Sequence, residues 1–333
     1  MIDRTSKEGA VQRLIFLLLL AAAVAGGTAY YQGFDFADLR LPDLATRKST
    51  SSDAPPPVVP SGSTITIATF NIQVFGKSKL EKPHVMDLLA RIVRRFDLVA
   101  IQEVRSLDQS IIPRFVEMIN AEGRKYDYVL GRRLGRTSSK EQYVYVYDTA
   151  SIDVDRDAID TIEDPDDRLH REPLVAPFRA RGPPADEAFT FTLVNIHTDP
   201  DEVADELNAL DDVFRAVVND GRGEDDVILL GDFNADDLHF GQLGQMSNIG
   251  WAISGIPTNT RGTRQYDNIV FDSLATTEFI GSAGVLDLMR EFELTREQAL
   301  EVSDHLPVWA EFSLYEGGRP SRVAAQPSRT VSQ

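Results

Sequence analysis

Apolar and polar residues alternate along residues 64–315 with two different periods, which indicates a domain that mixes strands and helices. Short β-branched or aromatic runs predict strands at Thr64–Phe70, Leu98–Ile101, Tyr143–Tyr147, Phe189–Ile196, Val227–Leu230, Tyr266–Phe271 and Leu306–Phe312. Segments with apolar residues three and four apart predict amphipathic helices at Pro83–Phe96, Ile111–Ile119 and Asp201–Val218. The mixture, without an internal repeat, predicts one α/β domain in which helices cover the sheets.

The two ends of the chain have a different composition from this domain. Leu14–Tyr31 is apolar or small throughout and follows three basic residues, which is typical of a signal peptide or a single membrane anchor within residues 1–31. A buried core helix is the alternative. Residues 32–63, whose second half is rich in Ser, Thr and Pro, predict a linker, and residues 316–333 predict a disordered tail. We therefore expect a secreted, periplasmic or membrane-anchored protein facing outside the cytoplasm, with cleavage of the segment left open.

Composition limits the chemistry that the domain can use. The 333 residues include no cysteine, which excludes thiolate catalysis, thiolate metal sites and disulfides, so a metal must be held by oxygen or imidazole. The net charge is −18, and the charges of residues 1–60 cancel, so the acidic excess lies in the predicted domain. Such a domain does not attract polyanions through its overall field. A polyanionic substrate would then depend on local cations or on a bound metal.

Polar side chains with catalytic capacity lie at the ends of six predicted strands. They are Asn71, Glu103, His197, Asp232 with Asn234, Asp267, and Asp304 with His305. If the last two strands run antiparallel to the others, all of these side chains reach one edge of the sheets. Each residue alone is more typical of a turn, a helix cap or a structural histidine. The coincidence of all six at strand ends favours one polar cleft.

This set of side chains suits metal-dependent hydrolysis of a phosphodiester. Glu103 and Asn71, with Asp304, offer the hard oxygen ligands that Mg²⁺ prefers, and Mn²⁺ is an alternative. The metal neutralises charge that develops on the phosphate. An imidazole beside a carboxylate can accept or donate a proton near neutral pH. Because the chain has only five histidines, His197 and His305 at strand ends are informative.

Four of these segments resemble the signature segments of the endonuclease/exonuclease/phosphatase superfamily and occur in the family's order. They are Thr69–Ile72, Ile101–Arg105, Gly231–Ala235 and Ser303–Val308. The resemblance implies a four-layer α/β/β/α sandwich with the active site at one edge of the packed sheets. The superfamily includes deoxyribonucleases, abasic-site endonucleases, sphingomyelinases and inositol-polyphosphate phosphatases, so the fold alone does not define the substrate.

Three further segments resemble the deoxyribonuclease I branch, namely Leu134–Tyr143, Arg171–Pro173 and Asn195–Pro200. The resemblance implies that Glu141 orients His197 and that Asp267 orients His305. It also implies that Asp232 and Asn234 position the water or the phosphate and that Asn71, Glu103 and Asp304 lie around the metal. The residues implied or expected to contact the substrate are Arg105, Arg171, Thr263 and Tyr266, with Arg136 in a cationic stretch that also contains Arg132, Arg133 and Lys140.

Two departures from the branch bear on the substrate. Ser139 stands where deoxyribonuclease I carries a tyrosine for the minor groove, which weakens the case for cutting duplex DNA. The acid-rich segment Asp153–Asp167 is typical of a solvated loop, with a structural Ca²⁺ site as the alternative. The leading hypothesis is a monomeric, exported or membrane-tethered DNA endonuclease. The alternatives are a phosphoesterase of the sphingomyelinase or phosphoinositide type and a non-catalytic surface binding protein.

Overall fold

The computed structural model describes residues 63–137 and 140–318. The predicted leader, nearly all of the predicted linker, Ser139 and most of the predicted tail lie outside the described residues. Within the described ranges, no helix has the length and apolar character needed to cross a membrane.

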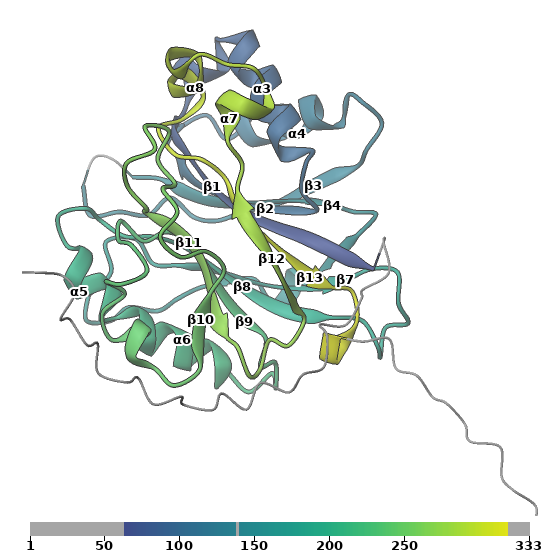
Figure 1. Cartoon of the computed structure of the whole chain (residues 1–333), viewed down its shortest axis with the longest axis vertical. Helices are drawn as coiled ribbons and strands as arrows, with labels where there is room; N and C mark the ends of the chain where they lie inside the picture. Colours follow the sequence, from purple (N-terminus) through teal and green to yellow (C-terminus); the bar gives the residue numbers. More distant parts are fainter. Residues whose placement is uncertain (1–62, 138–139, 319–333) are drawn as a thin grey trace, which may run out of the picture. The chain divides into compact units, whose positions relative to one another are not determined.

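Two β-sheets pack face to face at the centre of the domain (Figure 1). The first has the order β12 (Phe279–Val285), β13 (Val308–Ser313), β1 (Thr64–Phe75), β2 (Leu98–Val104), β4 (Gln142–Asp148) and β3 (Tyr126–Leu130). The second has the order β10 (Ile249–Trp251), β11 (Asp267–Asp272), β9 (Val227–Asp232), β8 (Thr190–His197), β7 (Leu174–Ala180) and β5 (Ile152–Val154), and β6 (Asp160–Thr161) pairs with β7.

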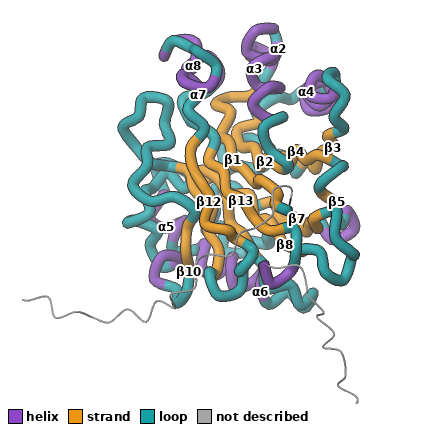
Figure 2. The backbone as a smooth tube through the Cα atoms, turned by 45° about the vertical axis from the view of Figure 1, so that its right-hand side comes forward, coloured by secondary structure: helices purple, strands orange, loops and turns teal. Residues whose placement is uncertain are grey.

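Helices cover the outer face of each sheet, above and below the strands in Figure 2. The first sheet carries α2 (Lys77–Leu80), α3 (Pro83–Val93), α4 (Ile111–Asn120), α7 (Leu288–Glu291) and α8 (Arg296–Val302). The second carries α5 (Val203–Leu207) and α6 (Leu210–Val218). Three apolar clusters fill the space between successive layers. The arrangement confirms the predicted four-layer α/β/β/α sandwich.

Strand direction brings the polar strand ends to one edge. In the first sheet, β1 runs parallel to β2 and antiparallel to β13. In the second, β8 runs parallel to β9, and β11 runs antiparallel to β9. The sequence predicts a single polar cleft if the last two predicted strands run antiparallel to the others. The structure meets this condition.

Several element boundaries differ from the predicted ones. The predicted helix Asp201–Val218 is wrong as one helix, because it is broken between α5 and α6 at Asn208 and Ala209. At this break the Asn208 side chain accepts a hydrogen bond from the backbone of Gln242. Helix α3 ends at Val93 rather than at Phe96.

Strands that lack a dense apolar run were not predicted from the sequence. One example is β12, which contains two glycines and a serine and whose residues are mostly half-buried. It is held by backbone pairing with β13. The pairing partner, which is remote in sequence, therefore defines this strand more than its own composition does.

Candidate active site at one edge of the two sheets

Backbone register places three of the predicted site residues in one row across the second sheet. His197 of β8 is paired with Asp232 of β9, and Asp232 is paired with Asp267 of β11. From the first sheet, Asn71 of β1 is in register with Gln102, the residue before Glu103. Residues more than 100 positions apart in the sequence thus meet because two sheets share an edge.

Gly231 allows β8 and β9 to approach closely just before Asp232. Its φ is +152°, and a Cβ atom at this position would lie 1.9 Å from the carbonyl oxygen of Ile196. No residue with a side chain fits there without moving one of the strands. Glycine at this position therefore sets the distance between His197 and Asp232.

Asp232 lies at the centre of the site and is 1% exposed. Its Oδ2 atom is 3.6 Å from Nε2 of His197 and 3.6 Å from Nε2 of His305. The same oxygen accepts a hydrogen bond of 2.9 Å from Nδ2 of Asn71. Its Oδ1 atom accepts one from the backbone N–H of Asn234, at 2.9 Å. One carboxylate thus faces two imidazoles.

The first imidazole belongs to a buried histidine–carboxylate pair. Nδ1 of His197 lies 2.7 Å from Oε1 of Glu141, whose side chain is fully buried. Burial opposes both charges, but the mutual attraction outweighs it: the pKa of His197 is raised and that of Glu141 is lowered. With Nδ1 engaged by Glu141, Nε2 is the nitrogen that faces Asp232 and the cleft.

Two guanidinium groups contribute to the low pKa of Glu141. The other carboxylate oxygen, Oε2, is 3.4 Å from Nε of Arg171 and 3.7 Å from Nε of Arg105. Arg171 is 5% exposed and also donates a hydrogen bond to the carbonyl of His197. The structure therefore places Arg171 behind the pair rather than on the surface, whereas the Arg105 side chain is 28% exposed.

The second imidazole has the same arrangement. Nδ1 of His305 lies 2.8 Å from Oδ2 of Asp267, and that oxygen also accepts a hydrogen bond of 2.6 Å from the Thr258 hydroxyl. Burial disfavours the imidazolium form, but Asp267 and Asp232 together raise the pKa of His305 well above its usual value. The sequence indicated both pairs only through the resemblance, since their members lie 56 and 38 residues apart.

The cleft also contains backbone that L-residues rarely adopt. Glu103 has a φ of +63° and Asn234 a φ of +48°. Such conformations cost on the order of 1–3 kcal/mol each and persist where surrounding contacts impose them. Here the Asn234 side chain donates to the carbonyl of Thr198, and Glu103 accepts a hydrogen bond of 2.7 Å from the backbone of Val74. The strain therefore lies at two of the residues that the sequence marked as functional.

The three predicted metal ligands offer a suitable set of donors. Oε1 of Glu103 lies 3.3 Å from the amide nitrogen of Asn71. Both Glu103 and Asp304 act electrostatically on the same buried ammonium group, that of Lys79. Within the described part of the chain, the carboxylate of Asp304 is half-buried and makes no hydrogen bond or ion pair. Hard oxygen donors with one carboxylate uncommitted fit a divalent cation.

A cavity of about 1030 Å³ opens on the side of His305 where Tyr266 lies. Its lining includes Asn234, Thr263 and Tyr266, all of which the sequence marked for the site. The ring of Tyr266 lies 5.7 Å from that of His305. Thr263 accepts a hydrogen bond from Asn259, which is bridged to His305. Both residues therefore connect the cavity wall to the imidazole of His305.

A family model described as the Endonuclease/Exonuclease/phosphatase family matches residues 68–305. The chain belongs to this family. Deoxyribonuclease gamma of Rattus norvegicus is 32% identical over 80% of this chain and 88% of its own length. Deoxyribonuclease-1-like 2 of Homo sapiens is 34% identical over 73% of this chain and 90% of its own length. These relatives place the chain in the deoxyribonuclease I-like branch.

Two solved structures share the fold. Truncated Caenorhabditis elegans TDP2 aligns with a TM-score of 0.53 and 16% identity, over 76% of this chain and 98% of the other. The human Nocturnin catalytic domain aligns with a TM-score of 0.51 and 15% identity, over 76% and 94%. At this level of sequence identity, the similarity shows a shared fold and nothing about activity or substrate.

Two cations of the stretch around Arg136, namely Arg133 and Arg136 itself, contact other loops of the protein. Arg136 forms ion pairs with Asp167 and Glu202, at 3.0 and 2.6 Å. Arg133 donates hydrogen bonds to the carbonyls of Arg105, Ser106 and Lys140. In the structure as described, these guanidinium groups order the rim of the site, and Arg136 meets carboxylates rather than open cleft.

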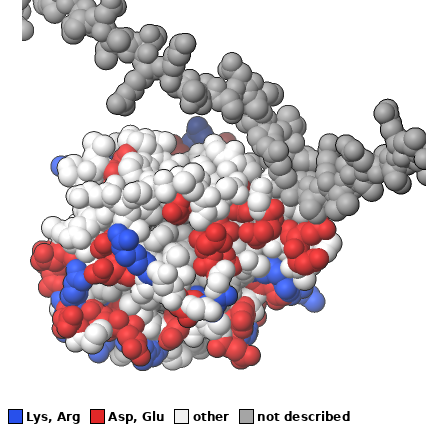
Figure 3. Space-filling view, turned by 90° about the horizontal axis from the view of Figure 1, so that it is seen from below, with Lys and Arg blue, Asp and Glu red and all other residues white. Residues whose placement is uncertain are grey.

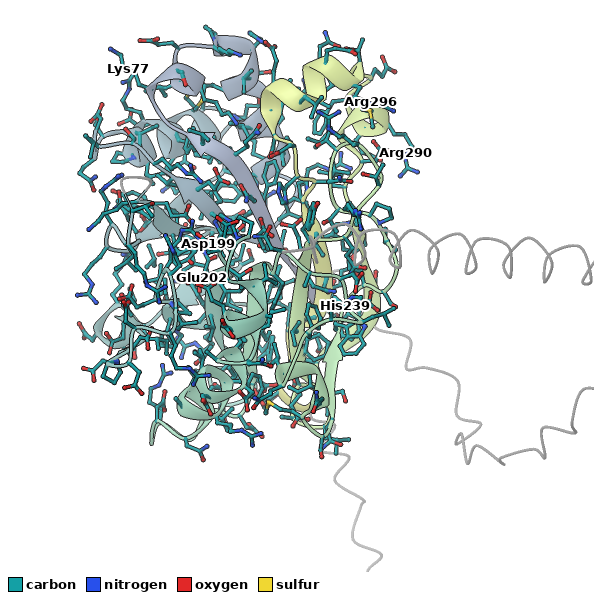
Figure 4. All side chains as sticks on the ribbon, turned by 90° about the vertical axis from the view of Figure 1, so that its left-hand side faces the viewer. Lys77, Asp199, Glu202, His239, Arg290 and Arg296 are labelled. Atoms are coloured by element: carbon teal, nitrogen blue, oxygen red, sulfur yellow. The ribbon has the colours of Figure 1, made fainter. Side chains whose placement is uncertain are left out.

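Acidic side chains cover more of the face seen in Figure 3 than basic ones do. On the side seen in Figure 4, the labelled Lys77, Arg290 and Arg296 lie near the helices of the first sheet, whereas Asp199 and Glu202 lie lower, near the second sheet. On this side, the labelled basic residues therefore lie apart from the labelled acidic ones.

Lys79 is a functional candidate that sequence reasoning missed. It is 8% exposed, and its ammonium group donates hydrogen bonds to the carbonyls of Ile72, Gln73 and Val302. Burial lowers its pKa to about 8, while Glu103 and Asp304 oppose that shift. It ties the end of β1 to the end of α8 next to two predicted metal ligands. A lysine in a short polar helix gives no sequence signal of this role.

Proposed function

We propose that this protein is a divalent-metal-dependent endonuclease that hydrolyses phosphodiester bonds of DNA. The observation that carries the proposal is the convergence of two histidine–carboxylate pairs on Asp232, each imidazole at 3.6 Å. Membership in the deoxyribonuclease I-like branch supports the reaction class. The names of the relatives support DNA as the substrate.

In this proposal, water attacks the phosphorus atom in line with the leaving oxygen. One imidazole accepts the proton of the water and the other protonates the leaving oxygen, so the two pairs act on opposite sides of the phosphate. Asp232 and Asn234 orient the water or the phosphate between them. Glu141 and Asp267 keep Nε2 of their histidines directed at the cleft, and we assign Arg171 to positioning Glu141 and Arg105 to contact with the substrate.

Glu103, Asn71 and Asp304 would hold the cation, with Mg²⁺ as the first choice and Mn²⁺ as the second, and its charge would neutralise the phosphate. Thr263 and Tyr266 line the cavity beside His305, where the nucleotide next to the cut bond would lie. Arg136 is a rim residue that could reach a phosphate only by exchanging its two carboxylate partners for it. We further propose export, because Leu14–Tyr31 is typical of a leader or an anchor.

A supercoiled plasmid tests the proposal directly. The full chain is incubated with Mg²⁺, Mn²⁺, Ca²⁺ or EDTA, and the same conditions are applied to RNA and to sphingomyelin. We expect nicked plasmid with Mg²⁺ or Mn²⁺ and none with EDTA. Cleavage of sphingomyelin without cleavage of DNA would instead support a lipid phosphoesterase. No cleavage of any diester with all three metals would support a binding protein.

A further inference from the structure

Three carboxylates meet at the end of the sandwich opposite the candidate active site. Asp226 directly precedes β9, the strand that ends at Asp232. Glu278 precedes β12, and Glu316 belongs to the 3₁₀ turn η4 (Glu316–Gly318), the yellow turn at the lower right of Figure 1. One oxygen of each carboxylate lies within 4.8 Å of the other two. The group, here termed the far-end cluster, thus joins the second sheet to the first.

The charges of the far-end cluster are not balanced by protein cations. Asp226 and Glu278 are each 1% exposed, and across residues 63–137 and 140–318 neither they nor Glu316 form an ion pair with Lys, Arg or His. Burial, followed by the charge of Glu278, raises the pKa of Asp226 to about 9. Two more carboxylates, Glu224 and Asp225, lie beside Asp226. Buried carboxylates without cations are costly unless something else neutralises them.

Oxygen atoms without hydrogen-bond partners converge at this cluster. Oδ1 of Asp226 and Oε2 of Glu278 are buried and accept no hydrogen bond from any described residue. The Thr276 hydroxyl, 2% exposed, faces Asp226 and lowers its pKa, yet its oxygen also lacks a partner of normal geometry within the described ranges. Buried polar atoms are nearly always satisfied in folded proteins. The oxygens that face one another here must be bridged, either by a proton held on Asp226 or by a cation that binds to oxygen.

Backbone contacts hold the carboxylates in place around these atoms. The other oxygen of Glu278, Oε1, accepts a hydrogen bond of 2.5 Å from the N–H of Gly317. Oε2 of Glu316 accepts one of 3.2 Å from the N–H of Thr190. The side chains are therefore oriented before any ligand binds, which lowers the entropy lost on binding.

We propose that the far-end cluster is a structural binding site for a divalent cation, with Ca²⁺ as the best fit. Ca²⁺ binds six to eight oxygen ligands with flexible geometry and accepts carboxylates and uncharged oxygens in the same site. Asp226, Glu278 and Glu316 provide the charged ligands, and Thr276 provides a neutral one. The cation ties β9 to β12 and η4, and so clamps the two sheets together at the end away from the chemistry.

Thermal unfolding of the full chain tests this site without relying on catalysis. Glu103→Gln serves as the background, because it removes a predicted ligand of the active-site cation. In this background we expect Ca²⁺ at about 100 times its dissociation constant to raise Tm by about 5–10 °C over EDTA. The triple variant Asp226→Asn, Glu278→Gln, Glu316→Gln should lose this shift and bind one Ca²⁺ fewer in equilibrium dialysis.

A second triple variant controls for the change in net charge. Glu117→Gln, Asp186→Asn and Asp205→Asn neutralise three exposed carboxylates elsewhere, and this protein should keep the full Ca²⁺ shift. If the far-end triple variant does not fold, the single variant Glu316→Gln serves, with an expected loss of at least tenfold in Ca²⁺ affinity. A Ca²⁺ shift that survives in the far-end variant, or that is absent from the background protein, overturns the proposal. So does an unchanged Ca²⁺ stoichiometry.

Discussion

The two ends of β9 carry the same residue type in opposite electrostatic surroundings. Asp226 before the strand and Asp232 at its end are both aspartates and both 1% exposed. Asp232 faces two imidazoles at 3.6 Å, whereas Asp226 faces Glu278 and Glu316. At one end the protein provides the positive charge itself. At the other it brings three carboxyl groups together and provides no described cation.

The difference shows that burial alone does not define what a carboxylate does. At the Asp232 end, each oxygen of Asp232 accepts a hydrogen bond, and each imidazole is backed by its own carboxylate. Oε2 of Glu141 and Oδ1 of Asp267 accept no hydrogen bond, but Oε2 of Glu141 lies beside the guanidinium groups of Arg171 and Arg105. This end therefore holds its own positive charge in fixed positions, which suits catalysis by fixed groups. At the Asp226 end, the unsatisfied oxygens have no cation beside them among the described residues, which suits the binding of an external cation. Four experiments test this contrast, in order of expected effect.

Gly231→Ala should have the largest effect, because Gly231 allows β8 and β9 to approach closely just before Asp232. The new Cβ would overlap the carbonyl of Ile196, and alanine disfavours the φ of +152°. We expect a loss of about 4 kcal/mol in the free energy of unfolding, measured by urea denaturation. Gly281→Ala is the matched control, since Gly281 has a φ of +80° but no atom near its added Cβ. The control should lose only about 1–2 kcal/mol; equal losses would contradict the steric explanation.

Removing either imidazole at the Asp232 end should abolish most of the activity. We expect His197→Ala and His305→Ala each to reduce kcat for plasmid nicking by roughly 10²-fold or more, the usual effect of deleting an acid–base group. In the double variant, kcat should fall by a factor much smaller than the product of the two single-variant factors, because the two pairs act together in one step. His84→Ala is the control: His84 also pairs with a glutamate, Glu301 at 2.9 Å, but is exposed and remote. Near-normal rates for both site variants would rule out this mechanism.

Glu141→Gln tests whether a carboxylate sets the titration of His197. Glu141 raises the pKa of His197, so the imidazole of the wild-type protein keeps its proton to higher pH. Without that charge the pKa of His197 falls, and the limb of the kcat–pH profile that His197 governs moves to lower pH. We expect this shift together with a loss of about tenfold in kcat. Glu301→Gln, beside exposed His84, should leave the profile in place. If the kcat–pH profile of Glu141→Gln does not move, the titration of His197 does not control kcat.

The smallest effect is expected at the Asp226 end in the presence of EDTA. Burial and the charge of Glu278 raise the pKa of Asp226 to about 9, so folding at neutral pH requires this carboxyl group to take up a proton. Asp226→Asn keeps the size of the side chain and removes that cost, which should stabilise the metal-free protein by about 1 kcal/mol, seen as a rise of about 2–4 °C in Tm by calorimetry. Asp186→Asn, which neutralises an exposed aspartate, should change Tm by much less. A fall in Tm for Asp226→Asn would show that its carboxylate is already stabilised by the protein.

Much of the fold was predictable because the strongest elements carry their own signal. Strand β9 begins with a continuous apolar run, β8 is rich in apolar and β-branched residues, and α3 and α4 show a helical period. The resemblance added the layer order, which local periodicity does not contain. Strand β12 and the break between α5 and α6 were not predicted, because each depends on a partner that is distant in the sequence.

The site was predictable in part for the same reason. Residue types at strand ends indicated where Asn71, Glu103, His197, Asp232 and His305 would lie. The burial of Arg171, the engagement of Arg136 by Asp167 and Glu202, and the role of Lys79 came only from the structure. The sequence around a loop arginine contains no signal that distinguishes an arginine facing the substrate from one facing another loop.

The sequence by itself determined the chemistry that this protein can perform and the elements that carry it. Side-chain type and strand position are local properties, and they place carboxylates and imidazoles at strand ends whatever the rest of the chain does. Only the tertiary structure decided which charges meet. Electrostatic energy depends on distance and burial, and both are set by strand register and sheet packing between residues far apart in the chain. That is why Asp226 and Asp232, six residues apart at the two ends of β9, lie in opposite environments.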